Sequence, residues 1–165
     1  MTSAETRSRS GPAWLRPAVA VLGLLYLALG VAGFVTPGTA AIGHGTGRTV
    51  WIFGATPLLD LVHTAVGVLG LLAATRRTRS IIYCWVLFAG FAGMTAYGVL
   101  STAFTNPEDP INVNWADNAL HGLTAVAGLV LGIFGARAAA RRAEHRVKEV
   151  PMHRERETPP RRAGA

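Results

Sequence analysis

The 165-residue sequence has little cysteine and little charge, and each scarcity excludes a class of protein. Cys84 is the only cysteine, which excludes an internal disulfide and a metal site built from cysteines alone. Charged residues make up 15% of the chain, against about 25% in an ordinary soluble protein. The sequence also lacks a phosphate-binding glycine loop, a metalloprotease motif, a C-x-x-C-H haem motif and a nucleophile–base motif. We therefore expect no enzyme.

What the chain has instead is a set of long apolar segments. Half of its residues are hydrophobic, and a membrane-spanning helix needs about 20 largely apolar residues. Four segments meet this requirement or come close to it, at residues 17–35, 58–74, 81–104 and 115–136. The second is short, and the fourth begins with polar side chains. The pattern predicts an all-α integral membrane four-helix bundle made of two helical hairpins.

The basic residues indicate how this bundle is oriented. Fifteen of the 16 Lys and Arg residues lie in the N-terminal tail, in the second connection or in the C-terminal tail, and Arg48 is the exception. The positive-inside rule then places both termini in the cytoplasm and the protein in the cell inner (cytoplasmic) membrane. We expect the basic C-terminal tail to contact anionic lipids. No motif for reading nucleic acid accompanies the net charge of +7. The sequence does not identify a protein partner, and it is compatible with a homo-oligomer.

The segments around the apolar core divide the chain further. Residues 1–13 are expected to form a disordered cytoplasmic tail, and residues 14–136 the transmembrane domain. Residues 137–165 are expected to form a basic cytoplasmic helix, ended by Pro151, and then a disordered tail. In the first connection, the apolar patch at residues 50–53 is expected at the level of the lipid headgroups.

An internal repeat relates the second and fourth segments. Asp60 and His63 in the second correspond to Asn118 and His121 in the fourth. Each histidine is followed on the same helical face by small residues, which allow membrane helices to approach closely. These helix-packing positions are Gly67 and Gly70 in the second segment, and Gly128 and Gly132 in the fourth. We expect the two faces to turn inward and the histidines to meet, or nearly meet.

The polar residues beside the histidines suggest how the rings are held. Asp60 precedes His63 by three residues, Asn118 precedes His121 by three, and Asp117 precedes it by four. Each histidine could therefore bond a polar side chain one helical turn earlier. The structural interpretation is a buried polar cluster that ties the second and fourth helices together, with Asp117 and Asn118 also capping a helix. We prefer this structural or accessory role.

Two other interpretations use the same histidines. His63 and His121 could be the two ligands of a haem or a metal ion, supported by a neighbouring carboxylate. They could also form a proton site or a small-molecule site. Two histidines do not distinguish these possibilities, so the redox or ligand-binding alternative stays open.

Two stretches resemble a known family. They are Pro57-Leu-Leu-Asp-Leu-Val-His63 with Gly67, and Asn114-Trp-Ala-Asp-Asn-Ala-Leu-His121. With the Gly-x-x-Tyr26-x-x-x-Gly30 stretch, they resemble DUF4383, a family of small, mostly actinobacterial membrane proteins catalogued as a domain of unknown function. The resemblance covers residues 14–136 and implies a four-helix membrane protein with no known activity. Asp60 stands where the family usually has asparagine. A more distant similarity, in helix count and size, is to DoxX-like membrane proteins, which are associated with redox functions.

Overall fold

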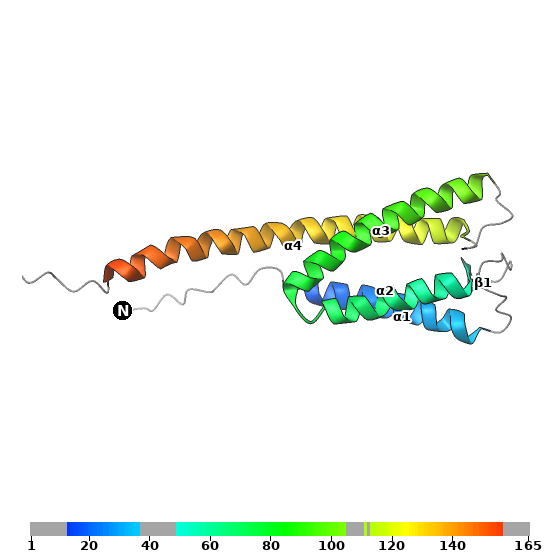
Figure 1. Ribbon diagram of the computed structural model, residues 1–165, viewed down its shortest axis with the longest axis horizontal. Coiled ribbons are helices and arrows are strands. Elements are labelled where there is room, and N and C mark those ends of the chain that lie inside the picture. The colour runs from blue at the N-terminus through cyan, green and yellow to red at the C-terminus, as the bar shows by residue number, and fades with distance from the viewer. Residues whose placement is uncertain (1–12, 37–48, 105–110, 112, 157–165) are drawn as a thin grey trace, which may run out of the picture.

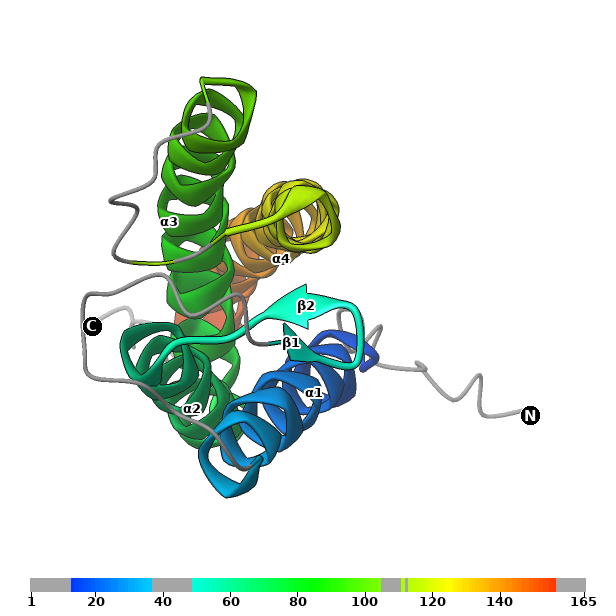
Figure 2. The same cartoon turned by 90° about the vertical axis from the view of Figure 1, so that its right-hand side faces the viewer.

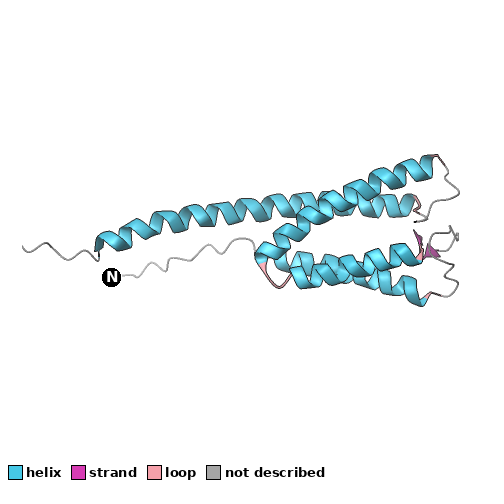
Figure 3. Ribbon diagram, in the orientation of Figure 1, coloured by secondary structure: helices cyan, strands magenta, loops and turns pink. Residues whose placement is uncertain are grey.

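A computed structural model describes residues 13–36, 49–104, 111 and 113–156 of the chain. Within these ranges it contains four helices and one short hairpin of strands (Figures 1 and 3). The helices are α1 (Leu15–Val35), α2 (Pro57–Ala73), α3 (Arg77–Ala103) and α4 (Trp115–Arg156). The strands are β1 (Thr49–Val50) and β2 (Phe53–Gly54). The expected N-terminal tail lies almost wholly outside the described residues, as do Arg48 and residues 157–165.

The helices pack as two hairpins, α1 with α2 and α3 with α4, which confirms that part of the prediction. By length and composition, α1, α3 and the first 33 residues of α4 could each cross a membrane. Helix α2 is a shorter apolar helix of 17 residues, at the lower limit of about 17 residues for a span. Large apolar side chains such as Leu25, Val86 and Leu123 are exposed along the outer helix faces. An apolar exterior of this kind suits lipid better than water.

Glycines bring α1 and α2 into close contact. A Cβ atom added to Gly67 would lie 2.6 Å from the Cα atom of Leu27, and one added to Gly70 would lie 2.9 Å from the Cα atom of Gly23. Both neighbours belong to α1, and both are backbone atoms that cannot move aside. Gly67 and Gly70 therefore determine how closely the first hairpin packs.

The second hairpin uses its glycines in the same way. A Cβ atom on Gly128 would lie 2.8 Å from the backbone nitrogen of Phe88, and one on Gly132 would lie 3.2 Å from the ring of Trp85. Both neighbours are on α3. The sequence predicted that the glycine faces of α2 and α4 would turn inward, and all four glycines are buried, but it did not predict which helices they would contact. Close backbone approach requires helices that run side by side, and α2 and α4 each do so with their hairpin partner.

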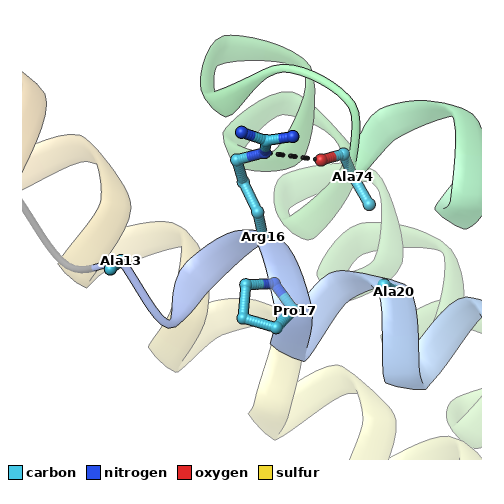
Figure 4. Close-up of a pocket in the computed structure, with 5 residues that line it drawn as sticks. All are labelled: Ala13, Arg16, Pro17, Ala20 and Ala74. Atoms are coloured by element: carbon cyan, nitrogen blue, oxygen red, sulfur yellow. Dashed lines mark hydrogen bonds between the residues drawn. The ribbon is translucent and has the colours of Figure 1, made fainter.

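Basic residues gather where α1 begins and α2 ends. The Nε atom of Arg16 donates a 2.8 Å hydrogen bond to the carbonyl oxygen of Ala74, just after the end of α2 (Figure 4). This bond satisfies one of the carbonyls that a helix end leaves without an internal partner. A cavity of about 290 Å³ lies beside it, lined by Ala13, Arg16, Pro17, Ala20 and Ala74. The next helix, α3, starts nearby at Arg77.

Helix α4 extends well beyond the bundle (Figure 1). It has 42 residues, a length of about 63 Å at about 1.5 Å per residue. The sequence predicted that Pro151 would end it, but the helix continues to Arg156. Proline removes one backbone donor, and the adjacent turns keep their own bonds.

At the opposite end, the strands form a small hairpin that the sequence did not predict. β1 and β2 pair antiparallel through Thr49 with Gly54 and Val50 with Phe53. β1 contacts α1 and β2 contacts α4, so the hairpin lies across the ends of both helical hairpins (Figure 2). At its tip, Trp51 has a φ of 55° and is 77% exposed. A non-glycine residue pays about 1–2 kcal/mol for that left-handed conformation.

Candidate functional site

Four rings from all four helices meet inside the bundle. The ring centroids of His63 (α2) and His121 (α4) lie 5.9 Å apart. Tyr26 of α1 packs against His63 at 5.4 Å, and Phe91 of α3 packs against His121 at 5.2 Å. Tyr26 and Phe91 lie 5.0 Å from each other. The two histidines that the sequence singled out are therefore brought together where the two hairpins touch. We call these four residues the ring cluster.

The histidines are buried, yet most of their ring nitrogens lack partners among the described residues. His121 is 0% exposed and His63 is 2% exposed. Among the described residues, neither nitrogen of His121 has a hydrogen-bond partner, and the same holds for Nε2 of His63. A buried polar group without a partner costs about 1–3 kcal/mol. Such a cost is unusual in a native core and requires an explanation.

Asp117, the first expected partner of His121, is used elsewhere. Its Oδ2 atom accepts hydrogen bonds from the backbone nitrogens of Gly54 and Asn114, both at 2.9 Å. Oδ1 of Asn114 in turn accepts from the nitrogens of Ala116 and Asp117. This reciprocal pattern is a capping box with Asn114 as the N-cap of α4. Asp117 therefore closes the helix start and attaches the strand hairpin to it.

Asn118, the second expected partner, bonds a different helix. Its Nδ2 atom donates to Oγ1 of Thr102 in α3 at 3.2 Å, and Thr102 donates to the carbonyl oxygen of Val113. The expectation that Asp117 or Asn118 would hold His121 was wrong, and so was the expectation that Asn118 would be a cap. Backbone donors and a threonine from other segments bind these side chains instead.

Asp60 is buried near the start of α2. Its carboxylate lies against Gly33 of α1, where a Cβ atom would collide with it. Thr56 caps α2 by accepting from the nitrogen of Leu59 at 3.2 Å, and Pro57 follows at the first helical position. That Asp60 orients His63 stays a prediction.

Two tyrosines connect the hairpins near the ring cluster. The hydroxyls of Tyr26 and Thr124 lie 2.7 Å apart, and Thr124 donates to the carbonyl oxygen of Leu120. Tyr26 is therefore the donor in the bond from α1 to α4. Tyr83 of α3 donates to the carbonyl oxygen of Val66 in α2 at 2.8 Å. Sequence reasoning gave none of these bonds. Phe91 was also missed, because it stands among many apolar residues of one span.

The residues around the histidines offer little to a metal ion. Within the described part of the chain, no group of three or more His, Cys, Asp or Glu side chains is placed to hold one. His63 and His121 alone would leave at least two positions of a tetrahedral ion without protein ligands. Tyr26 and Phe91 occupy the space against the two imidazoles, where a haem would need a wide flat slot. The donor set therefore does not fit either group.

The capping box gives a direct test of what Asp117 does. Replacing Asp117 with alanine should lower stability by about 2 kcal/mol, because two backbone N–H groups lose their acceptor. Thermal unfolding in detergent would measure the loss. A matched control is Trp115→Ala, two residues earlier in the same helix and exposed, which should change the melting temperature little. Equal melting temperatures for the two variants would show that the box does not stabilise the fold.

Comparison with known proteins gives one match. The family model described as "Domain of unknown function (DUF4383)" matches residues 16–134. This range contains all four rings of the cluster and ends within α4. No curated protein and no solved structure matches the chain.

Proposed function

From the premise that this chain belongs to the DUF4383 family, we propose that it is a four-span protein of a bacterial cytoplasmic membrane that binds a small membrane-soluble molecule at His63 and His121. In this proposal the two hairpins are related by the internal repeat and form the site where they meet. Both termini lie in the cytoplasm. The strand hairpin and the ring cluster then belong to the outer half of the membrane.

The arrangement of charge supports this orientation. Arg16 lies beside the end of α2, and the basic part of α4 starts at Arg137. The end with the strand hairpin instead exposes Trp51 and Ile52, which are typical of the headgroup region. At the basic end, Arg16 and the basic part of α4 would contact anionic lipid headgroups, at about 1 kcal/mol per well-placed side chain.

The single observation that carries the binding proposal is that His121 has no hydrogen-bond partner in the part of the chain that the structure describes. A purely structural clasp would gain about 0.6–2 kcal/mol from each hydrogen bond between helices. Asp117 and Asn118, the residues expected to make those bonds with His121, bind other partners. What remains is ring packing, worth about 0.5–1.5 kcal/mol per pair. That does not exceed the cost of the unpartnered nitrogens, so the histidines are better explained by a ligand.

The symmetry of the two hairpins supports the repeat. Gly70 lies seven residues after His63 and meets Gly23, which is three residues before Tyr26. Gly128 lies seven residues after His121 and meets Phe88, which is three residues before Phe91. Each hairpin thus contributes one histidine and one aromatic ring in matching positions. A binding site on such a pseudo-two-fold axis receives one imidazole from each half.

The second candidate is the structural or accessory role. The bonds from Tyr26 to Thr124 and from Tyr83 to Val66 favour it, because they join the hairpins without using a histidine. A structural role would require only that the ring cluster fill space.

The molecules that copurify with the protein separate the two candidates. The protein would be purified from a bacterial membrane in mild detergent. Bound species would be extracted with organic solvent for mass spectrometry, with metal analysis and an optical spectrum beside it. We expect one organic species in stoichiometric amount with the wild type, which His121→Leu loses. Leu123→Ala, a lipid-facing control on the same helix, should keep it.

Two outcomes would contradict the binding proposal. Identical extracts from the wild type and both variants would favour the structural role. A Soret band or a stoichiometric metal that His121→Leu removes would instead support the redox alternative, despite the poor fit of the donor set.

A further inference from the structure

A groove between α2 and α3 leads from the surface of the bundle to His121. It has a volume of about 170 Å³ and is otherwise lined by apolar side chains, Tyr83 and Gly90. Its floor includes Leu59, Leu87, Phe91 and His121, all buried. Few residues of α2 and α3 pack together, because each helix pairs mainly within its own hairpin.

The rim of the groove is apolar and open to the outside of the bundle. Val86 is 61% exposed, and Leu69 and Val62 on the facing helix are exposed as well. In a membrane these side chains face lipid, so the groove would admit molecules from the bilayer rather than from water. Of the two polar side chains in its lining, Tyr83 already donates its hydroxyl to Val66, whereas His121 has no partner among the described residues.

The size of the groove indicates what fits inside it. A dry apolar cavity of about 150 Å³ in another protein binds benzene. The groove is slightly larger, so it holds one six-membered ring, and any tail on that ring would pass between Val62 and Val86 toward the lipid.

The chemistry of His121 indicates what the ring carries. A neutral imidazole has one N–H donor and one acceptor nitrogen. A hydroxyl oxygen can use either nitrogen, and a carbonyl oxygen can accept from the donor. A purely apolar molecule, such as a lipid acyl chain, would leave both nitrogens unpartnered.

We propose that the α2–α3 groove binds a lipid-soluble molecule with a single ring that bears a hydroxyl or carbonyl oxygen, of the phenol, quinol or quinone class, with that oxygen bonded to His121. This proposal rests on the proposed function and specifies its ligand and its entrance. The groove provides the apolar fit, and the buried imidazole selects for the oxygen.

The test uses 4-propylphenol as the probe, with propylbenzene as the matched molecule that lacks oxygen. Equilibrium dialysis would measure binding to full-length protein in nanodiscs, and empty nanodiscs would correct for partition into lipid. We expect saturable binding of one 4-propylphenol per protein, at least tenfold tighter than that of propylbenzene. Equal binding of the two molecules would overturn the proposal, because it would show that the groove does not recognise the oxygen and binds apolar molecules such as lipid chains equally well.

Two glycines of α3 supply a matched pair of variants. Among the described residues, a Cβ atom on Gly90 or on Gly93 would meet no other side chain or neighbouring helix within 4 Å, but of the two only Gly90 lines the groove. Gly90→Leu should therefore fill the groove and reduce binding at least tenfold, whereas Gly93→Leu should bind like the wild type. Val86→Trp, at the exposed rim, should also weaken binding and serves if Gly90→Leu does not fold.

The variants also separate this proposal from the proposed function. If His121→Leu loses 4-propylphenol while Gly90→Leu and Val86→Trp keep it, the ligand reaches the histidines by another route and the groove is wrong. If no protein binds 4-propylphenol but the copurified species still depends on His121, the ligand class is wrong and the site stands. If neither 4-propylphenol binding nor any copurified species depends on His121, both proposals fail.

Discussion

Replacing Gly67 with valine is expected to lower the stability of the bundle by about 3 kcal/mol, near the upper end for an overpacked site. The added Cβ would lie 2.6 Å from the Cα atom of Leu27. Because the obstruction is backbone, α1 and α2 would have to separate along their contact. The substitution therefore disturbs the whole first hairpin rather than one side chain. Thermal unfolding in detergent, followed by circular dichroism, measures the effect.

The matched control is Gly93→Val, because a Cβ atom at Gly93 has open space around it. Both substitutions replace glycine with a β-branched residue in an apolar helix, so the change in helix propensity is the same for both. The difference between them isolates the contact with α1. If the two variants have the same melting temperature, the close approach of α1 and α2 at Gly67 is not what stabilises the hairpin.

Replacing His121 with leucine is expected to have the opposite effect on stability and to remove ligand binding. The substitution eliminates two buried ring nitrogens that have no partner within the described structure, which relieves about 1–3 kcal/mol for each nitrogen. It also loses ring packing with His63 and Phe91, worth about 0.5–1.5 kcal/mol per pair. We expect a net gain of about 1 kcal/mol in ligand-free protein, seen as a higher melting temperature.

A second variant in the ring cluster, Tyr26→Phe, should change stability in the opposite direction to His121→Leu. Tyr26→Phe removes the hydroxyl that donates to Thr124, and should cost about 0.6–1.7 kcal/mol, as for other hydrogen bonds between membrane helices. Opposite signs for the two variants would separate a residue kept for binding from one kept for structure. A lower melting temperature for ligand-free His121→Leu would favour the structural clasp.

The sequence predicted the helices and the meeting of the histidines better than the contacts around them. Apolar segments long enough to span a membrane indicated four helices, because each length is set by the thickness of the bilayer. They did not indicate where the helices end. α3 starts at Arg77 rather than at residue 81, and α4 continues past Pro151, because a helix does not have to end where its apolar residues end.

The partners of Asp117 and Asn118 show why the site was harder to predict. Spacing along one helix correctly placed both residues one turn before His121, but local spacing says nothing about competitors from other segments. The nitrogen of Gly54 and the hydroxyl of Thr102 are 63 and 16 residues away along the chain, and these groups bind the two side chains. The same limit explains the glycines, since a small-residue face does not identify the helix that it will contact.

The central claim is that a ring nitrogen of His121 is bonded by a ligand and neither nitrogen is bonded by the protein. The most direct measurement is the ¹⁵N NMR spectrum of histidine-labelled protein in nanodiscs, recorded for the wild type and for Asn118→Ala, each with and without 4-propylphenol. The ligand-site proposal predicts that the probe shifts the ring signals of His121 in both proteins and that Asn118→Ala alone leaves them unchanged. Signals that move with Asn118→Ala and do not respond to the probe would contradict it, because they would show that the imidazole is held by the protein itself.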